Sequence, residues 1–459
     1  MPQTEIALFK AFVASPLFNT RDTLISLLDE YLVRDKSPED RFAAVFPGRP
    51  FQPKAYNTLT GELYDLLKRF WAHQELEKRP ELRNILGLHA MRDHGLERHF
   101  EAEAKRINKH LEQSSRRDPD HYYYRYLLAD EQNAWYAQRL VRRFDASLQN
   151  KMDALDAFYF GAKFGNSAEA LSRNSILNAQ YELPFLESLC ALFDRKPGRF
   201  PPSVKVYRQL LTCLQVPGDR RHYDEFSELL STHAADFPPE EARALFKTAQ
   251  NYCIRRINLG ETSFQEELFV LYQSLLERRL IFDGKDQLAH TDFKNIVTVG
   301  LRQEAFAWVA DFIETHSNDV DEAHRDNVRH YCLALYHAEH KEPNKAIRLL
   351  AEVHFTDTLY DLSARRLLAQ CYYEQQDWEG LAHHLNAFDL FLRRKKDLAT
   401  QIKNSHLHFV KILKAIAKLQ EQAPYLNPKK KDARLQTLKA RILRTEPLAY
   451  REWLGGLIS

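Results

Sequence analysis

The stretch YYEQQDWEGLAHHL, Tyr372–Leu385, has the same organisation as an earlier stretch, YHAEHKEPNKAIRLL, Tyr336–Leu350. In each of them an apolar helical pattern stops at a short polar turn, and a second apolar pattern follows. The step from Tyr336 to Tyr372 is 36 residues, and the step from Leu350 to Leu385 is 35. Two short antiparallel helices joined by a tight turn and repeated at such an interval are typical of a solenoid.

The apolar positions on both sides of each turn follow the helical period. Residues at i, i+3, i+4 and i+7 lie on one face of a helix. The first helices of the two pairs have this spacing at Val328, Tyr331, Cys332 and Leu335, and then at Ala364, Leu368, Cys371 and Tyr372. The second helices have apolar faces at Ala346, Ile347, Leu350 and Val353, and then at Trp378, Leu381, Leu385 and Phe388.

This pattern resembles tetratricopeptide repeats. Leu368, Tyr372, Leu385 and Phe388 fall where that family places large packing residues on its two helices. The interval is slightly longer than the usual period of the family, and Leu381 stands where the family usually has a small alanine. We therefore describe the predicted fold as TPR-like.

The rest of the chain also predicts an all-α fold. Glycine is scarce, with 14 residues, about 3% against a usual ~7%, which favours helices and disfavours glycine-rich catalytic loops. We expect an α-solenoid of stacked antiparallel helix pairs with an N-terminal helical region. The predicted parts are an N-terminal helical region (1–145), a TPR-like solenoid (146–392), and basic C-terminal helices that cap it (393–459).

The net charge of +2 hides an uneven distribution. Residues 393–459 contain 16 Lys and Arg and 5 Asp and Glu, a net charge of +11. Residues 1–392 contain 49 basic and 58 acidic residues, a net charge of −9. An acidic body is therefore joined to a basic end.

Five cysteines, an odd number without a CxxC pair, are predicted to be small core residues in a reducing compartment. They are Cys190, Cys213, Cys253, Cys332 and Cys371.

The N-terminal segment lacks a basic leader followed by an uninterrupted apolar segment, and no apolar run reaches the ~18 residues that span a bilayer. These features predict a cytoplasmic protein without a membrane span.

The chain contains 19 histidines, which are common metal ligands. His330, Cys332, His337 and His340 lie close together in sequence, but Cys332 projects about 160° from His330 around a helix. The four side chains cannot converge on one ion, so we predict no metal site here and no cofactor. The chain also lacks the P-loop, GxGxxG, GxSxG, HExxH and EF-hand motifs, and we expect no enzymatic activity.

Two segments could contact nucleic acid. In residues 121–144 tyrosines and tryptophan alternate with arginines, which can stack on bases, although large aromatics in a long helix more often pack in a core. At the basic end a helix is predicted with lysines on one side and apolar residues on the other, and it either meets a polyanion or caps the solenoid. The basic patch comprises Arg393, Arg394, Lys395, Lys396, Lys411, Lys414, Lys418, Lys429, Lys430 and Lys431.

Several strings resemble an uncharacterised family of helical-repeat proteins found in the Bacteroidetes. They are SPLFN (15–19), NYCIRRINLG (251–260), FKNIVTVGL (293–301) followed by Trp308, CYYEQQ (371–376) and FLRRKK (391–396). The resemblance implies a helical-repeat fold and a bacterial cytoplasmic setting. It implies no activity and assigns no catalytic residue.

Two functions remain open. The first is a non-enzymatic scaffold or adaptor that binds a peptide or helix of a protein partner on a concave surface, lined by the first helix of each pair. Its candidate contacts are Asn251, Arg255, Asn295, Arg329 and Arg366. The alternative is a nucleic-acid-associated regulator that acts through the basic C-terminal helices, with binding that weakens steeply as salt rises.

Overall fold

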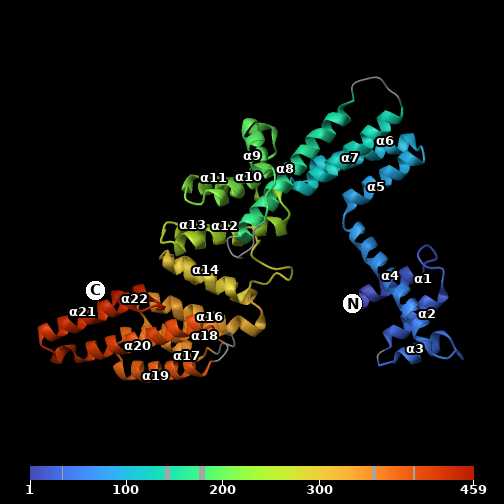
Figure 1. The fold of residues 1–459 in the computed structure, drawn as a ribbon. Coiled ribbons are helices and arrows are strands. Elements are labelled where there is room, and N and C mark those ends of the chain that lie inside the picture. The colour runs from blue at the N-terminus through green and yellow to red at the C-terminus, as the bar shows by residue number, and fades with distance from the viewer. Residues whose placement is uncertain (34, 140–144, 175–180, 354–357, 396–397, 459) are drawn as a thin grey trace. The chain divides into compact units, whose positions relative to one another are not determined.

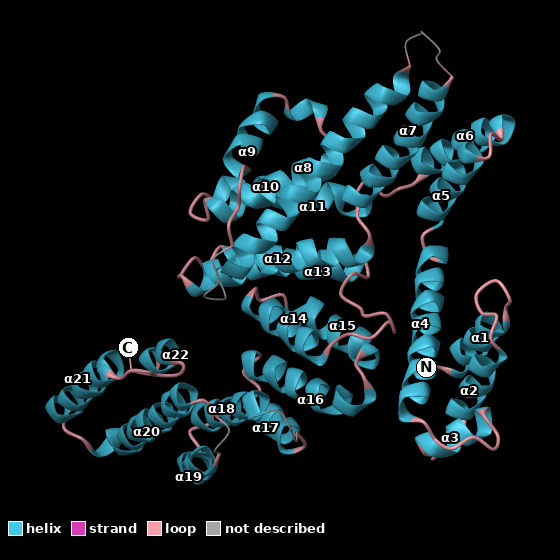
Figure 2. Cartoon of the chain, turned by 45° about the vertical axis from the view of Figure 1, so that its right-hand side comes forward, coloured by secondary structure: helices cyan, strands magenta, loops and turns pink. Residues whose placement is uncertain are grey.

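The computed structural model describes residues 1–459 apart from 34, 140–144, 175–180, 354–357, 396–397 and 459. Within the described residues every regular element is a helix, and the only β-type pairing is an isolated bridge between Leu288 and Val320 (Figure 2). The prediction of an all-α fold is therefore confirmed. In the described part of the chain, no helix is both long and apolar enough to cross a bilayer.

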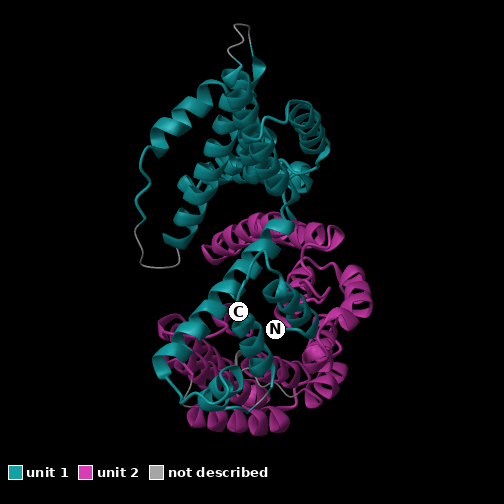
Figure 3. Ribbon diagram, turned by 90° about the vertical axis from the view of Figure 1, so that its right-hand side faces the viewer, with its two compact units in different colours: residues 1–238 teal, residues 239–459 magenta. Residues whose placement is uncertain are grey.

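The chain divides into two compact units, residues 1–238 and residues 239–459 (Figure 3). This division lies at neither of the boundaries predicted near 145 and 393, which remain predictions. The helices of the first unit, labelled in Figure 1, are α1 (Gln3–Ala14), α2 (Asp22–Leu32), α3 (Pro38–Val45), α4 (Pro53–Glu77), α5 (Pro80–Asp93), α6 (Glu97–Gln113), α7 (Pro119–Gln138), α8 (Ala146–Asn174), α9 (Leu186–Arg195), α10 (Pro202–Gln215) and α11 (Arg220–His233).

The helices of the second unit follow the same numbering. They are α12 (Pro239–Asn258), α13 (Phe264–Glu277), α14 (His290–Arg302), α15 (Phe306–His316), α16 (Glu322–Glu339), α17 (Pro343–Ala351), α18 (Thr358–Glu374), α19 (Trp378–Arg394), α20 (Thr400–Gln422), α21 (Pro428–Arg444) and α22 (Arg451–Gly456). Many helices of both units begin with proline, whose fixed φ and missing N–H suit the first helical position.

Two separate aromatic cores form in the N-terminal part of the first unit. Phe9 and Phe12 of α1 pack against Phe70 of α4 with ring centroids 5.3 and 5.6 Å apart. In α6 and α7, Phe100 and Trp135 stack at 4.4 Å within a second buried cluster. The remainder of the unit is organised around α8, which packs against α7 on one side and α10 on another.

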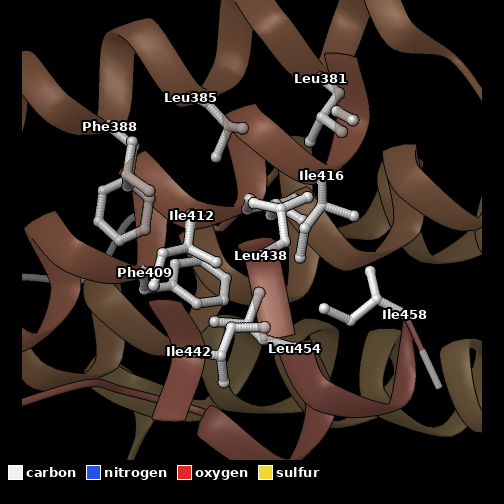
Figure 4. Close-up of a cluster of buried hydrophobic side chains, with 14 of the residues drawn as sticks. Leu381, Leu385, Phe388, Phe409, Ile412, Ile416, Leu438, Ile442, Leu454 and Ile458 are labelled. Atoms are coloured by element: carbon white, nitrogen blue, oxygen red, sulfur yellow. The ribbon is translucent and has the colours of Figure 1, made fainter. Parts of the chain in front are cut away.

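In the second unit each helix from α12 to α21 packs against the helix that follows it in sequence. Contacts also join α14 to α16 and α16 to α18, which are the first helices of consecutive pairs. A large cluster of buried side chains lies among α18–α22 (Figure 4), and most of its buried residues come from the segment 393–459. The basic C-terminal helices therefore belong to the core of this unit.

The same turn joins the two helices of successive pairs. Its central residue is left-handed at Gly260, Glu304, Lys341 and Gln376, with φ of 96°, 55°, 59° and 58°. At the last of these, Gln376 N–H donates to the Tyr373 carbonyl (3.0 Å) and Asp377 N–H donates to the Tyr372 carbonyl (3.1 Å). The three earlier turns have the same two bonds, which define a Schellman motif. This recurrence explains the sequence echo, because both stretches encode this one turn.

Replacing Gln376 by glycine should stabilise the second unit. A residue with a side chain in the left-handed region costs roughly 1–2 kcal/mol, and glycine avoids this cost. We expect the free energy of unfolding of Gln376→Gly to rise by about 1 kcal/mol, measured by urea denaturation. The matched control is Ala387→Gly, at an exposed position in the middle of α19, which should lower stability by about 0.5–1 kcal/mol. Equal destabilisation by the two changes would contradict this account of the turn.

His121 should make the first unit sensitive to acid. The residue is 3% exposed, and burial, together with the cations of Arg117 and Arg125, lowers its pKa from 6.5 to about 4. The unfolded chain therefore takes up a proton below pH 6.5 that the folded chain takes up only near pH 4. Stability is lost as pH falls through this window, by roughly 1–3 kcal/mol.

The measurement compares wild type with His121→Phe by chemical denaturation at pH 7 and pH 4.5. The variant should lose less stability than the wild type between these two values. The exposed His99 of α6 provides the control, since His99→Phe should not change the pH dependence. A variant that follows the wild-type pH profile would exclude His121 as the source.

Candidate functional site

A pocket of about 260 Å³ lies between α13 and α15 in the second unit. The C-terminal half of α13 contributes one wall and the length of α15 contributes the other. The indole of Trp308 stacks on Phe312 (5.5 Å between ring centroids) and meets the edge of Phe269 (4.9 Å), so its orientation is fixed by packing. The polar and aromatic residues of the lining are Gln273, Glu277, Trp308, Asp311, Phe312 and His316.

The charge of this pocket is negative. Glu277 and Asp311 are exposed, and among the described residues neither is within ion-pair distance of a cation. His316 uses its Nδ1 to contact Asp319 Oδ2 at 2.7 Å. An aromatic ring beside two carboxylates suits a cationic group, which gains both a cation–π contact and charge-assisted hydrogen bonds. The sequence missed this pocket, because its two walls come from segments that belong to different helix pairs.

The five residues predicted to line a concave surface lie on first helices: Asn251 and Arg255 on α12, Asn295 on α14, Arg329 on α16 and Arg366 on α18. Asn251 and Arg329 are exposed, and Arg255 is half-buried. Asn295 is exposed but shares a hydrogen bond with the phenol of Tyr272, on α13. Their binding role stays a prediction.

Arg366 is already engaged within the chain. Its guanidinium lies over the ring of Tyr450, 4.4 Å from the centroid, and donates to Gln370 Oε1 at 2.9 Å. Tyr450 precedes α22, and its ring also lies near His406 (6.3 Å) and Phe409 (5.9 Å) of α20. Arg366 is half-buried, and its guanidinium is held against the C-terminal segment by this contact.

The C-terminal segment covers the first helices α18 and α20. Trp453 of α22 meets Tyr373 of α18 (6.0 Å between centroids) and Phe409 of α20 (6.1 Å). Leu454 is fully buried.

Some residues of the basic patch bind other side chains of the chain, and others are exposed without an ion pair. Lys414 donates to Asn386 Oδ1 (2.8 Å), and Arg393 pairs with Asp389 (2.7 Å). Lys395 and Lys431 are half-buried, and Lys396 lies outside the described residues. The exposed residues with no ion pair among those described are Arg394, Lys411, Lys418, Lys429 and Lys430.

Three lysines, Lys429, Lys430 and Lys431, occupy the first turn of α21. Cations there oppose the helix dipole, whose positive end is the N-terminus, so the lysines do not stabilise the helix they begin. The turn is capped instead by Asn427, whose side chain accepts from Lys429 N–H at 3.0 Å.

The aromatic segment, residues 121–144, contains both buried and exposed residues. Tyr122, Tyr124 and Trp135 of α7 are buried, which confirms the core interpretation for these three residues. Arg139 lies over Trp135 (4.1 Å) and pairs with Glu97 and Glu101 of α6, both at 3.0 Å. The arginines Arg142 and Arg143 lie outside the described residues.

The three histidines near Cys332 in sequence each contact a different residue. His330 contacts Glu352 (3.5 Å), His337 contacts Glu342 (2.7 Å), and His340 packs on Phe306 (4.4 Å between centroids). Cys332 is fully buried, and burial raises the pKa of its thiol well above the usual range. Cys213, Cys253 and Cys371 are also buried, as predicted, whereas Cys190 is half-buried.

Among the described residues one group of three side chains could hold a metal ion: His290, Asp321 and His324. The sequence analysis missed it, because His290 and Asp321 are far apart in the chain and belong to different helix pairs. The one local signal was the Asp-x-x-His spacing of Asp321 and His324, which also occurs in ordinary helix caps.

No protein-family model, no curated protein and no solved structure matches this chain.

Proposed function

We propose that the chain is a non-enzymatic protein-interaction scaffold whose second unit is a TPR-like α-solenoid. Two features support the architecture: consecutive helices of this unit pack in sequence order, and the same Schellman turn recurs in four successive pairs. Repeat architectures of this kind expose long surfaces between helices, where an extended or helical segment of a partner can bind.

The observation that carries the proposal is the pocket that Trp308 lines together with two carboxylates, Glu277 and Asp311, which have no cation partner among the described residues. Two carboxylates that line one pocket without a cation repel each other and add no attraction to the fold. A lysine or arginine of a partner would relieve this repulsion and cover the indole. The partner is therefore a protein segment with a basic residue, inserted between the second helices α13 and α15.

The composition of the same region agrees with a basic partner. Residues 239–392 contain 25 acidic and 16 basic residues, a net charge of −9, so the whole excess of negative charge in residues 1–392 lies here. Such a field raises the encounter rate of a cationic segment. The pocket then provides the local contacts that hold one side chain.

We expect a peptide with spaced arginines to bind the full chain and a matched glutamate peptide not to bind. Binding is measured by fluorescence polarisation at about 0.15 M salt. Trp308→Ala should weaken binding about 5- to 30-fold, because the ring contributes on the order of 1–2 kcal/mol. The double variant Glu277→Lys, Asp311→Lys should abolish it.

The control is Glu314→Lys, an exposed charge change on α15 that does not line the pocket. It should reduce affinity less than threefold through net charge alone. If Glu314→Lys weakens binding as much as Asp311→Lys, the pocket has no special role, and only the general acidity of the surface attracts the peptide.

The alternative, a nucleic-acid-associated regulator, is favoured by one observation: the three lysines in the first turn of α21. Removing residues 393–459 would not test it, because these residues supply most of the buried cluster around α18–α22. Charge reversal at the exposed lysines leaves that core intact.

If this alternative holds, a single-stranded RNA oligonucleotide should bind with an affinity that falls steeply between about 50 and 200 mM salt. Lys429→Glu combined with Lys430→Glu should weaken this binding at least tenfold and reduce the salt slope. The control, Lys345→Glu on α17, should have no effect, since Lys345 is paired with Glu342 at 2.8 Å. RNA binding that is absent even at the lowest salt would eliminate the alternative.

A further inference from the structure

We propose that His290, Asp321 and His324 form a binding site for one divalent transition-metal ion, with Zn²⁺ as the expected occupant. One potential ligand atom of each residue lies within 4.8 Å of the others. The inference is independent of the proposed scaffold function, because it uses none of the residues of the α13–α15 pocket.

The three side chains come from two neighbouring helix pairs. His290 is the first residue of α14, Asp321 is the N-cap of α16, and His324 lies one turn into α16. His324 Nδ1 lies 2.9 Å from Asp321 Oδ1 and 3.0 Å from Oδ2. The rings of His290 and His324 are nearly parallel, 4.2 Å apart between centroids with an interplanar angle of 5°. An ion among them would link α14 to α16.

The backbone that carries these residues is held in place. Leu288 N–H donates to the Asp319 carbonyl at 2.9 Å, beside the bridge between Leu288 and Val320, and both bridge residues are buried. Arg325 donates to the carbonyl of Val320 at 3.0 and 3.2 Å and to that of Asn318 at 3.1 Å. The loops before α14 and α16 are therefore fixed relative to each other, so the two histidines are held close together. One imidazole must turn out of the stack for both rings to face one ion, since an imidazole nitrogen coordinates in the plane of its ring.

A third helix supports His290. Tyr360, on α18, donates its hydroxyl to the His290 carbonyl at 3.3 Å, and its ring lies 5.6 Å from the imidazole. His290 thus lies against Tyr360 and, through its ring stack, against His324. These contacts hold the backbone and the ring of His290 against α18.

The donor set selects the class of ion. Two imidazole nitrogens and one carboxylate oxygen suit Zn²⁺, whereas Ca²⁺ and Mg²⁺ require oxygen ligands. Asp321 Oδ1 accepts the Ala323 N–H at 3.1 Å, and both carboxylate oxygens lie within 3.0 Å of His324 Nδ1, so the carboxylate is held beside that ring. The side chains of Asp321 and His324 are 38% and 46% exposed, and water can supply the fourth ligand.

A simple helix cap does not account for the whole arrangement. Aspartate–histidine pairs three residues apart also occur at His233 and Asp236 (3.0 Å) and at His316 and Asp319 (2.7 Å). Among the groups of described residues that could hold a metal, neither of those pairs has a third ligand. The additional imidazole from a separate helix distinguishes the site at Asp321.

The ion would act as a cross-link. A cavity of about 260 Å³ adjoins Asp321, but its lining does not include His290 or His324. The proposed ion is therefore not placed in that cavity. Its expected effect is on stability, because an ion that binds the folded state raises the free energy of unfolding.

The test uses the full chain, stripped with a chelator and titrated with Zn²⁺ by calorimetry, with bound metal counted by mass spectrometry. The wild type should bind one equivalent more than His290→Gln, His324→Gln or Asp321→Asn, each of which should lose at least tenfold in affinity at this site. Asn caps helices as well as Asp, so Asp321→Asn retains the start of α16. Zn²⁺ should raise the melting temperature of the wild type and raise it less in these variants.

The matched control is His233→Gln, which removes a paired histidine of the first unit and should retain the wild-type stoichiometry and the Zn²⁺-induced rise in melting temperature. Co²⁺ should give the visible absorption of a four-coordinate site in the wild type and in His233→Gln, and not in His290→Gln. Unchanged Zn²⁺ stoichiometry and affinity in His290→Gln, or no Zn²⁺ binding by the wild type at micromolar concentration, would overturn the proposal.

Discussion

A pair of short helices cannot bury its own apolar face, and this constraint organises the second unit. The second helix α19 presents Leu385 and Phe388, both fully buried, and they are covered only because α20 contributes Phe409, Ile412 and Ile416 to the same cluster. In turn α20 is covered by Leu438 and Ile442 of α21 and by Leu454 of α22. Each fully buried leucine or phenylalanine contributes on the order of 1.5–3 kcal/mol, so the stability of one pair depends on its neighbour.

At the turns between paired helices, the stacking of helices outweighs the backbone preference of individual residues. With so little glycine in the chain, three of the four recurring turns place Glu304, Lys341 and Gln376 in the left-handed region. Each costs roughly 1–2 kcal/mol, yet each satisfies two backbone carbonyls and returns the chain against the preceding helix. Packing of the second helix against the first offsets the cost. Scarcity of glycine therefore does not mean scarcity of tight turns.

The sequence predicted what depends on local periodicity. The turn at Gln376, the helix that begins at Pro343 and the apolar side of α20 all follow from residues that are close neighbours in the chain. The pocket and the histidine group do not, because Glu277 and Asp311, like His290 and Asp321, come together only when neighbouring pairs stack. The contact of Arg366 with the ring of Tyr450, 4.4 Å from the centroid, likewise depends on a much later part of the chain, so no local spacing predicts it.

Exposed charges and buried side chains contribute differently to this unit. Buried side chains hold the fold together, whereas exposed charges act on molecules in solution. Residues 393–459, with a net charge of +11, share a core with α18 and α19 from the acidic segment. Between exposed charges, attraction decays within about 8 Å at physiological salt, so it adds little to a core of fully buried side chains. The excess charges act instead on molecules that approach from solvent, and a partner with only net charge would be held weakly. Under the proposed scaffold function, tight binding therefore requires a cation that also fits the aromatic wall of Trp308. Under the nucleic-acid alternative, it requires a polyanion that contacts the exposed lysines of the C-terminal helices.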